Sequence, residues 1–352
     1  SYGIAILFAL GGLFFHGATA YALTITPIRM ELSADPGQKI TRDVTLYNER
    51  DTPETFYTSY ANFEAQGESG APSFVDPKYG IGTWISAEEK IVIPPKTART
   101  IPFTITVPSA AEPGGHFGAI FWGTAAKTNG AGEVSIGAKT GFLVLLSISG
   151  NISEKGGIVD FSTMGKQRFY TSLPVHFVYR FENAGSDRIK PSGEVRIRNT
   201  IGITTTRIEG NPVDGNVLPR STRRFEPVWM GKDIVDEDHP YQGEGFFAAV
   251  KHEWRNFALG RYTAKLDLTY GTQNEITTAA WSFWVFPWQL LMVVILVLIS
   301  GFFVFRAAFI RYNRWVIGKA EHMLEEQLES KKEHTLVHRV MKSRAKKGKK
   351  KE

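Results

Sequence analysis

The sequence is 352 residues long, 43% apolar and 22% charged, with a formal net charge of +6 and no cysteine. This apolar content is enough for a packed core and argues against a disordered chain, while the lack of cysteine excludes disulfides, thiolate chemistry and cysteine-ligated metals. The positive charge is concentrated at one end, because residues 306–352 carry 14 Lys and Arg against 6 Asp and Glu, which leaves the remainder close to neutral.

The first 22 residues have the pattern of a secretory signal peptide. Ile4–Phe15 is a 12-residue apolar run, too short to span a bilayer comfortably, and small residues follow it. Ala20-Tyr21-Ala22 fits an A-x-A cleavage site, and Ala18-Thr19-Ala20 is a second option. We therefore expect a cleaved signal peptide over residues 1–22, with an uncleaved anchor as the alternative.

Residues 23–286 predict an all-β ectodomain of two tandem immunoglobulin-like β-sandwiches. Short β-branched or aromatic segments are broken by Gly, Pro, Asn and Asp about every 8–12 residues, as in sandwiches and barrels. The strands predicted for the first sandwich, 23–150, are 23–32, 39–48, 90–95, 99–108 and 141–150. Between them, residues 65–80 are interpreted as a long, loose spacer.

The second sandwich, 151–286, has its strongest alternation in 260–271, where Tyr262, Leu266 and Tyr270 belong to the inward face. Its other predicted strands are 173–183, 192–199 and 223–230. The two units have the pattern of a divergent repeat. Each has an early strand that ends in asparagine, Asn48 or Asn183, and a later aromatic strand opened by glycine.

The stretch AEPGGHFGAIFWG, 111–123, contains a histidine that is interpreted as part of a turn before a strand rather than as a catalytic group. The Pro-Gly-Gly run supplies the backbone freedom of a tight turn. His116 occupies the place that Arg261 takes in the second unit, so catalysis is not the favoured interpretation.

The strand that follows is apolar on both faces, with Phe117 and Phe121 on one side and Trp122 on the other. A strand of this kind needs a cover on each side. The cover is predicted to be the neighbouring domain or the 124–140 loop, and the alternative is an exposed patch that binds a ligand. Phe117, Phe121 and Trp122 are therefore the candidate ligand-binding residues.

A second apolar segment predicts a single transmembrane helix over residues 287–305. Trp288–Phe305 contains 18 residues without a charge, about 27 Å of helix. Tryptophans precede it as an interfacial belt would, and Arg306 and Arg311 follow it. Positive charge on that side predicts a cell-membrane protein with its ectodomain outside and residues 306–352 in the cytoplasm.

The tail predicts a short basic segment, helical or disordered. Residues 311–332 place apolar side chains at roughly helical spacing, and residues 344–352 are a lysine run. Nucleic-acid binding is not indicated, because aromatic residues are not interleaved with the basic ones. Anionic lipid headgroups are the expected partner, at about 1 kcal/mol per lysine. Alternatively, the tail only fixes the orientation.

No catalytic, cofactor-binding or metal site is predicted, so the chain is not expected to be an enzyme. The eight histidines include no His-Glu-x-x-His motif, because the pair with that spacing, His334 and His338, has threonine after the first histidine, and neither a Gly-x-Ser-x-Gly elbow nor a phosphate loop is present. The acidic run 233–240 could ligate calcium through Asp233, Asp236 and Asp238, but it lacks the spacing and glycine of an EF-hand loop. It is interpreted as a solvated loop.

The arrangement of signal peptide, two sandwiches, membrane helix and basic tail resembles the WxL-interacting protein family of bacterial cell surfaces. The local resemblance lies in residues 25–51, 107–123, 147–161 and 283–288, the last reading FWVFPW. The resemblance implies a first domain that binds peptidoglycan and a second that binds another surface protein. The expected function is a membrane-anchored cell-surface binding protein. The alternative is a non-catalytic accessory or scaffold of an extracellular carbohydrate-active or adhesion system.

Overall fold

The computed structural model describes residues 23–124, 139–231 and 245–348. The predicted signal peptide, the acidic run 233–240 and most of the 124–140 loop lie outside these residues. Two compact units divide the chain. The described residues up to Met230 form one unit together with Leu259–Val285, and those from Gly231 to Ala258 form the other together with the chain from Phe286 onward.

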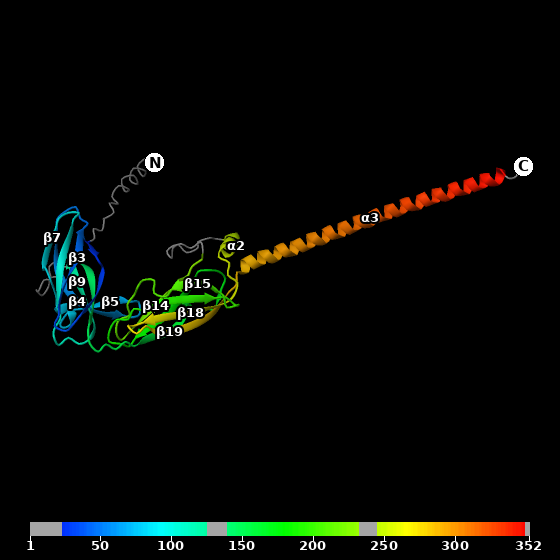
Figure 1. Ribbon diagram of the computed structural model, residues 1–352. Coiled ribbons are helices and arrows are strands. Elements are labelled where there is room, and N and C mark those ends of the chain that lie inside the picture. Colours follow the sequence, from blue (N-terminus) through cyan, green and yellow to red (C-terminus); the bar gives the residue numbers. More distant parts are fainter. Residues whose placement is uncertain (1–22, 125–138, 232–244, 349–352) are drawn as a thin grey trace, which may run out of the picture. The chain divides into compact units, whose positions relative to one another are not determined.

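The first half of the larger unit, strands β1 to β10, consists of two sheets (Figure 1). One has the order β1 (Leu23–Thr26), β3 (Lys39–Asn48), β8 (Ala98–Thr106) and β6 (Ile85–Ala87). The other has the order β2 (Arg29–Ala34), β10 (Lys139–Ile148), β9 (Gly114–Gly123), β4 (Glu54–Gln66) and β5 (Ala71–Val75), with β7 (Lys90–Ile93) paired to β4. The short helix η1 (Ile81–Thr83) precedes β6.

The second half, strands β11 to β19, also consists of two sheets. One contains β11 (Gly156–Thr163), β13 (Val175–Asn183) and β16 (Ser221–Phe225), with β17 (Val228–Trp229) paired to β13. The other has the order β12 (Phe169–Tyr170), β19 (Glu275–Val285), β18 (Gly260–Tyr270), β14 (Ser192–Arg198) and β15 (Thr204–Glu209). The short helix η2 (Met164–Lys166) lies between β11 and β12.

The strand orders of the two halves correspond, which supports the repeat predicted from the sequence. In each half the first stretch of chain crosses between the sheets. Strand β1 pairs antiparallel with β3 and β2 pairs parallel with β10, just as β11 pairs antiparallel with β13 and β12 parallel with β19. Residues 23–32 are therefore two strands and not the single one predicted, because Pro27 and Ile28 carry the chain from one sheet to the other.

The two asparagines noted in the sequence have equivalent buried positions at the ends of β3 and β13. The Asn48 side-chain amide donates to the carbonyls of Thr52 and Ile93, each at 3.0 Å. The Asn183 amide donates to the carbonyls of Asp187 and Val217 at 2.7 and 2.8 Å. Each asparagine connects the turn that follows it to a segment distant in the sequence, so buried backbone groups keep their hydrogen bonds.

The alternation predicted from the sequence is confirmed where strands face the core. The apolar residues that alternate through the predicted strand 99–108, Ile101, Phe103, Ile105 and Val107, are all buried. The inward face of β18 is also buried. In the second half, aromatic rings join the two sheets, with Phe177 and Phe283 at 5.5 Å and Phe181 and Tyr270 at 5.4 Å between ring centroids. The larger unit is thus mostly β-sheet, built around aromatic and β-branched cores.

Three predictions of local structure were wrong. Residues 65–80 are not a loose spacer, because β4 and β5 form a hairpin there. The range predicted as all-β contains a helix, α2 (Phe246–Arg255). The segments predicted as a membrane helix and a separate short tail helix are one continuous helix, α3 (Trp288–Gly348). Within the described part of the chain, α3 is the one helix long and apolar enough to cross a membrane, by length and composition.

Candidate functional site

Strand β9 is covered on both faces, as its composition required. Trp122 is 1% exposed and belongs to the core between the sheets of the first half. Phe121 is 6% exposed and packs with Ala61, Ala119 and Leu143 on the opposite, outer face of the sheet. The expectation that only one of the two neighbouring aromatics points into the core is met, and Trp122 is that residue.

Aromatic side chains from the β4–β5 hairpin cover the outer face. The ring of Phe74 meets that of Phe121 edge-on, with centroids 4.9 Å apart, and Phe63 lies 5.8 Å from Phe117. The ammonium of Lys139 lies 4.7 Å from the Phe121 ring centroid, within the range of a cation–π contact. The hairpin therefore buries Phe121 but leaves Phe74 itself 44% exposed.

A hollow of about 630 Å³ opens beside this cluster. Its apolar wall includes Ile28, Phe74, Leu143 and Val213, and Arg29 supplies a positive charge. Three of these apolar side chains, Ile28, Phe74 and Val213, are exposed. An exposed apolar surface of this kind, with a few polar groups, is typical of a binding site.

The second half of the larger unit contacts the turn of the β4–β5 hairpin. The guanidinium of Arg180 donates from Nε to both carboxylate oxygens of Glu68, at 3.0 and 2.9 Å. The backbone N–H of Arg224 donates to the Glu68 carbonyl at 2.7 Å. Gly70 allows this approach, since a Cβ there would lie 2.4 Å from the Cζ of Arg223. The second half therefore packs against the hairpin turn, while the rings over Phe121 and Phe117 come from the hairpin of the same half and not from the neighbouring domain that was predicted to cover them.

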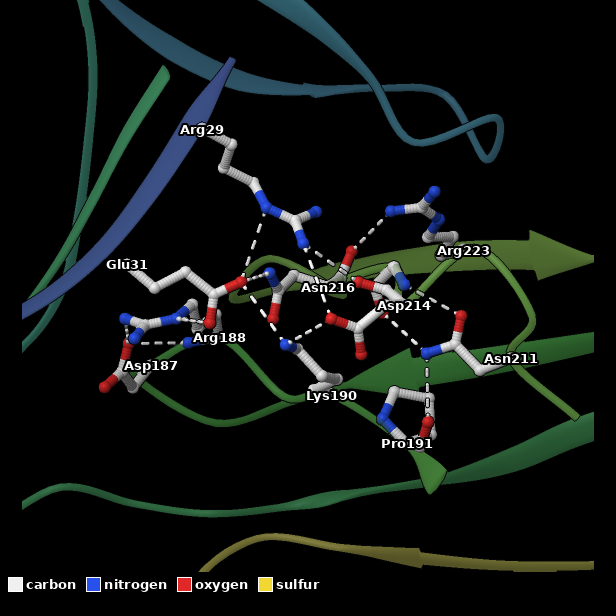
Figure 2. A network of polar contacts seen from close by, with 11 residues as sticks. Arg29, Glu31, Asp187, Arg188, Lys190, Pro191, Asn211, Asp214, Asn216 and Arg223 are labelled. Carbon is white, nitrogen blue, oxygen red and sulfur yellow. Dashed lines mark hydrogen bonds and ion pairs between the residues drawn. The ribbon is translucent and has the colours of Figure 1, made fainter. Parts of the chain in front are cut away.

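A polar network extends this contact along β2 (Figure 2). The carboxylate of Glu31 accepts a hydrogen bond from the Asn216 amide at 2.7 Å and lies 3.4 Å from the Lys190 ammonium. Lys190 also donates to Asp214 at 2.8 Å, and Asp214 lies 3.7 Å from the guanidinium of Arg29. Arg29 therefore connects the hollow to a chain of charges that comes mainly from the second half.

The network alters the acidity of its carboxyl groups. Burial by itself would raise the pKa of Glu31, but the hydrogen bond from Asn216 and the charges of Lys190, Arg188 and Arg29 outweigh it and hold the pKa below its ordinary value. The hydrogen bond from Lys190 likewise lowers the pKa of Asp214. Both groups are therefore carboxylates at neutral pH.

His116 lies in strand β9 and not in the predicted turn, because the strand already begins at Gly114. Its Nε2 is 2.9 Å from the carbonyl oxygen of Glu112, and its ring centroid is 4.8 Å from that of Trp84. Neither partner is a group that activates a histidine for catalysis. Among the described residues, His, Asp and Glu side chains form no cluster of three able to hold a metal.

The three predicted ligand-binding residues differ in how far they are buried and in whether they line the hollow. Trp122 was wrongly assigned, because the core encloses it. Phe121 lines the hollow only as its nearly buried floor, and Phe117 is half-buried beside Phe63. The exposed wall comes instead from Ile28, Phe74 and Val213. Sequence reasoning missed Phe74 because residues 65–80 were interpreted as a spacer.

No family model matches the chain, and no curated protein matches it. Among solved structures, it is similar to the class 5 fimbriae chaperone CfaA at 12% identity and a TM-score of 0.35, over 74% of this chain and 99% of that one. It is also similar to the Escherichia coli chaperone DraB at 10% identity and a TM-score of 0.33, over 75% of this chain and 96% of that one. It is similar, too, to the Pseudomonas aeruginosa chaperone CupB2 at 10% identity and a TM-score of 0.31, over 73% of this chain and 98% of that one. These likenesses are weak, so the function proposed below rests on the chain's own residues.

Proposed function

We propose that this protein is a membrane-anchored bacterial cell-surface binding protein of the WxL-interacting type, with two immunoglobulin-like sandwiches outside the membrane. In this proposal the first sandwich contacts peptidoglycan and the second contacts another surface protein. Helix α3 is the anchor, with its basic end in the cytoplasm, where lysines are attracted to anionic lipid headgroups.

The observation that carries the binding role is the hollow on the outer face of the first half. Ile28 is 75% and Val213 67% exposed, so apolar surface that folding would be expected to bury remains in water. Filling the hollow with a ligand would remove this surface from water, which is favourable by about 25 cal/mol per Å². Lys139 lies at the same face and favours a ligand that carries a negative charge as well as an apolar part. The charge of Arg29, by contrast, is already balanced by Glu31 and Asp214.

Cell-wall retention tests the proposal. The full chain, purified in detergent, would be sedimented with isolated bacterial cell walls, and Phe74→Ser would be compared with Phe169→Ser. Phe169 is a matched control, because it is an exposed phenylalanine on a strand of the other half. A central aromatic contact costs about 2 kcal/mol or more on truncation, which is roughly a thirtyfold loss of affinity.

We expect Phe74→Ser to lose retention and Phe169→Ser to keep it, with retention measured well below the melting temperature of each variant, because Phe74→Ser also uncovers Phe121 and should lower stability somewhat. Equal retention of all three proteins would contradict wall binding through the hollow. Failure of even the wild type to sediment with walls would favour the alternative role, that of a non-catalytic accessory or scaffold of an extracellular carbohydrate-active or adhesion system.

A further inference from the structure

Helix α2 is attached to the first turn of α3. The Glu253 carboxylate accepts a hydrogen bond from the backbone N–H of Leu290 at 2.6 Å, and both residues are buried. That N–H is one of the groups that a helix leaves without an internal partner at its beginning. The ring of Phe246 lies 6.4 Å from that of Trp288. Helix α2 is therefore held beside the point where the apolar stretch of α3 begins.

The opposite side of α2 is exposed and carries both aromatic and basic side chains. Phe247 is 82% and Trp254 70% exposed, and their spacing of seven residues places them on one face of the helix. Lys251 lies between them on that face, and Arg255 flanks it; both are exposed. Large aromatic side chains next to lysine and arginine are the composition of helices that lie in a membrane surface.

We propose that α2 is an interfacial helix that lies on the lipid surface where α3 enters the bilayer, with Phe247 and Trp254 inserted among the headgroups and Lys251 at anionic lipid phosphates. This inference rests on the proposed anchoring by α3. The attachment through Glu253 fixes α2 at the depth of the first turn of α3, and a bilayer is the surface present at that depth. Phenylalanine and tryptophan gain by leaving water there, while the cation gains by meeting phosphate.

The absence of cysteine from the sequence makes a clean test possible. Single cysteines would be introduced in the full chain as Trp254→Cys, Leu296→Cys and Tyr79→Cys, each labelled with the fluorophore NBD. All three positions are exposed, so labelling should not disturb packing. The proteins would be reconstituted into phosphatidylcholine vesicles with or without one third phosphatidylglycerol. Quenching would then be measured with iodide in the water and with lipids spin-labelled near the headgroup or deep in the acyl chain.

Each position reports on a different claim. Leu296→Cys should be quenched by the deep spin label, which tests the anchor itself. Trp254→Cys should be quenched by the shallow spin label and shielded from iodide, more strongly with phosphatidylglycerol. Tyr79→Cys should be open to iodide.

If the label at position 296 is quenched from the bilayer but the label at position 254 responds to iodide as the label at position 79 does, the interfacial helix is refuted while the anchor stands. If the label at 296 is not quenched from the bilayer, the anchor fails first. Phe247→Cys repeats the measurement on the same helix face.

Discussion

Alanine in place of Trp122 is expected to destabilise the protein more than alanine in place of Phe121, the next residue on the same strand. Trp122 is among the largest fully buried side chains, and truncation of such a residue costs about 3–5 kcal/mol because the cavity collapses only partly. The indole Nε1 has no hydrogen-bond partner within the described chain, so no bond is lost with it. Phe121 lies under Phe74 and Lys139, side chains that can move into the gap, and we expect about 2–3 kcal/mol.

Thermal melting of the full chain in detergent, followed by the circular dichroism of its strands, measures both losses. At about 2–4 °C per kcal/mol for a unit of this size, Trp122→Ala should lower Tm by roughly 6–20 °C. Phe169→Ala serves as the control, since a substitution at an exposed position changes stability by about 0.5 kcal/mol or less. A larger loss for Phe121→Ala than for Trp122→Ala would refute the assignment of the two faces of β9.

Three further predictions concern the turns and the contact between the halves. Asn48→Ala should cost about 2–4 kcal/mol in urea unfolding, because it leaves buried backbone groups unpaired. Glu31 has a lowered pKa in the fold, so its stabilising effect is present above its unfolded pKa of about 4.3 and is lost as pH falls through the lower folded value. The urea midpoint should therefore fall less between pH 7 and pH 3 in Glu31→Gln than in the wild type. Gly114→Ala should destabilise more than Gly67→Ala. Both glycines have positive φ, but only at Gly114 would a Cβ meet a backbone atom, the Ser186 carbonyl oxygen at 2.4 Å, whereas at Gly67 nothing lies within 4 Å.

The sequence predicted the strands that carry simple alternation. Residues 39–48 and 260–271 match β3 and β18 closely, because each has one buried face and its period is therefore visible. The repeat was also predictable, since Asn48 and Asn183 mark equivalent strand ends. Such patterns depend only on residues that are close together in the sequence, so they can be recognised without knowing the fold.

The features that were missed depend on contacts distant in the sequence. The hairpin of β4 and β5 contains Gly67 and Gly70 and looks like a spacer, and its role depends on Arg180, more than 100 residues away. Val213 lines the hollow because the second half packs against the first. No pattern in the sequence around Val213 indicates this contact. Helix α2 was missed because its buried face carries His252 and Glu253, polar residues whose burial is explained only by their partners.

The crossing of the first strand between sheets has a consequence for how the fold is held together. In each half one continuous peptide belongs to both sheets, first as β1 and β2 and then as β11 and β12. Separating the two sheets therefore requires one of them to release a strand. Backbone connectivity thus supplies the covalent tie that secreted domains often obtain from a disulfide. A reducing agent should leave this tie intact, so the folded state does not depend on the thiol–disulfide balance of its surroundings.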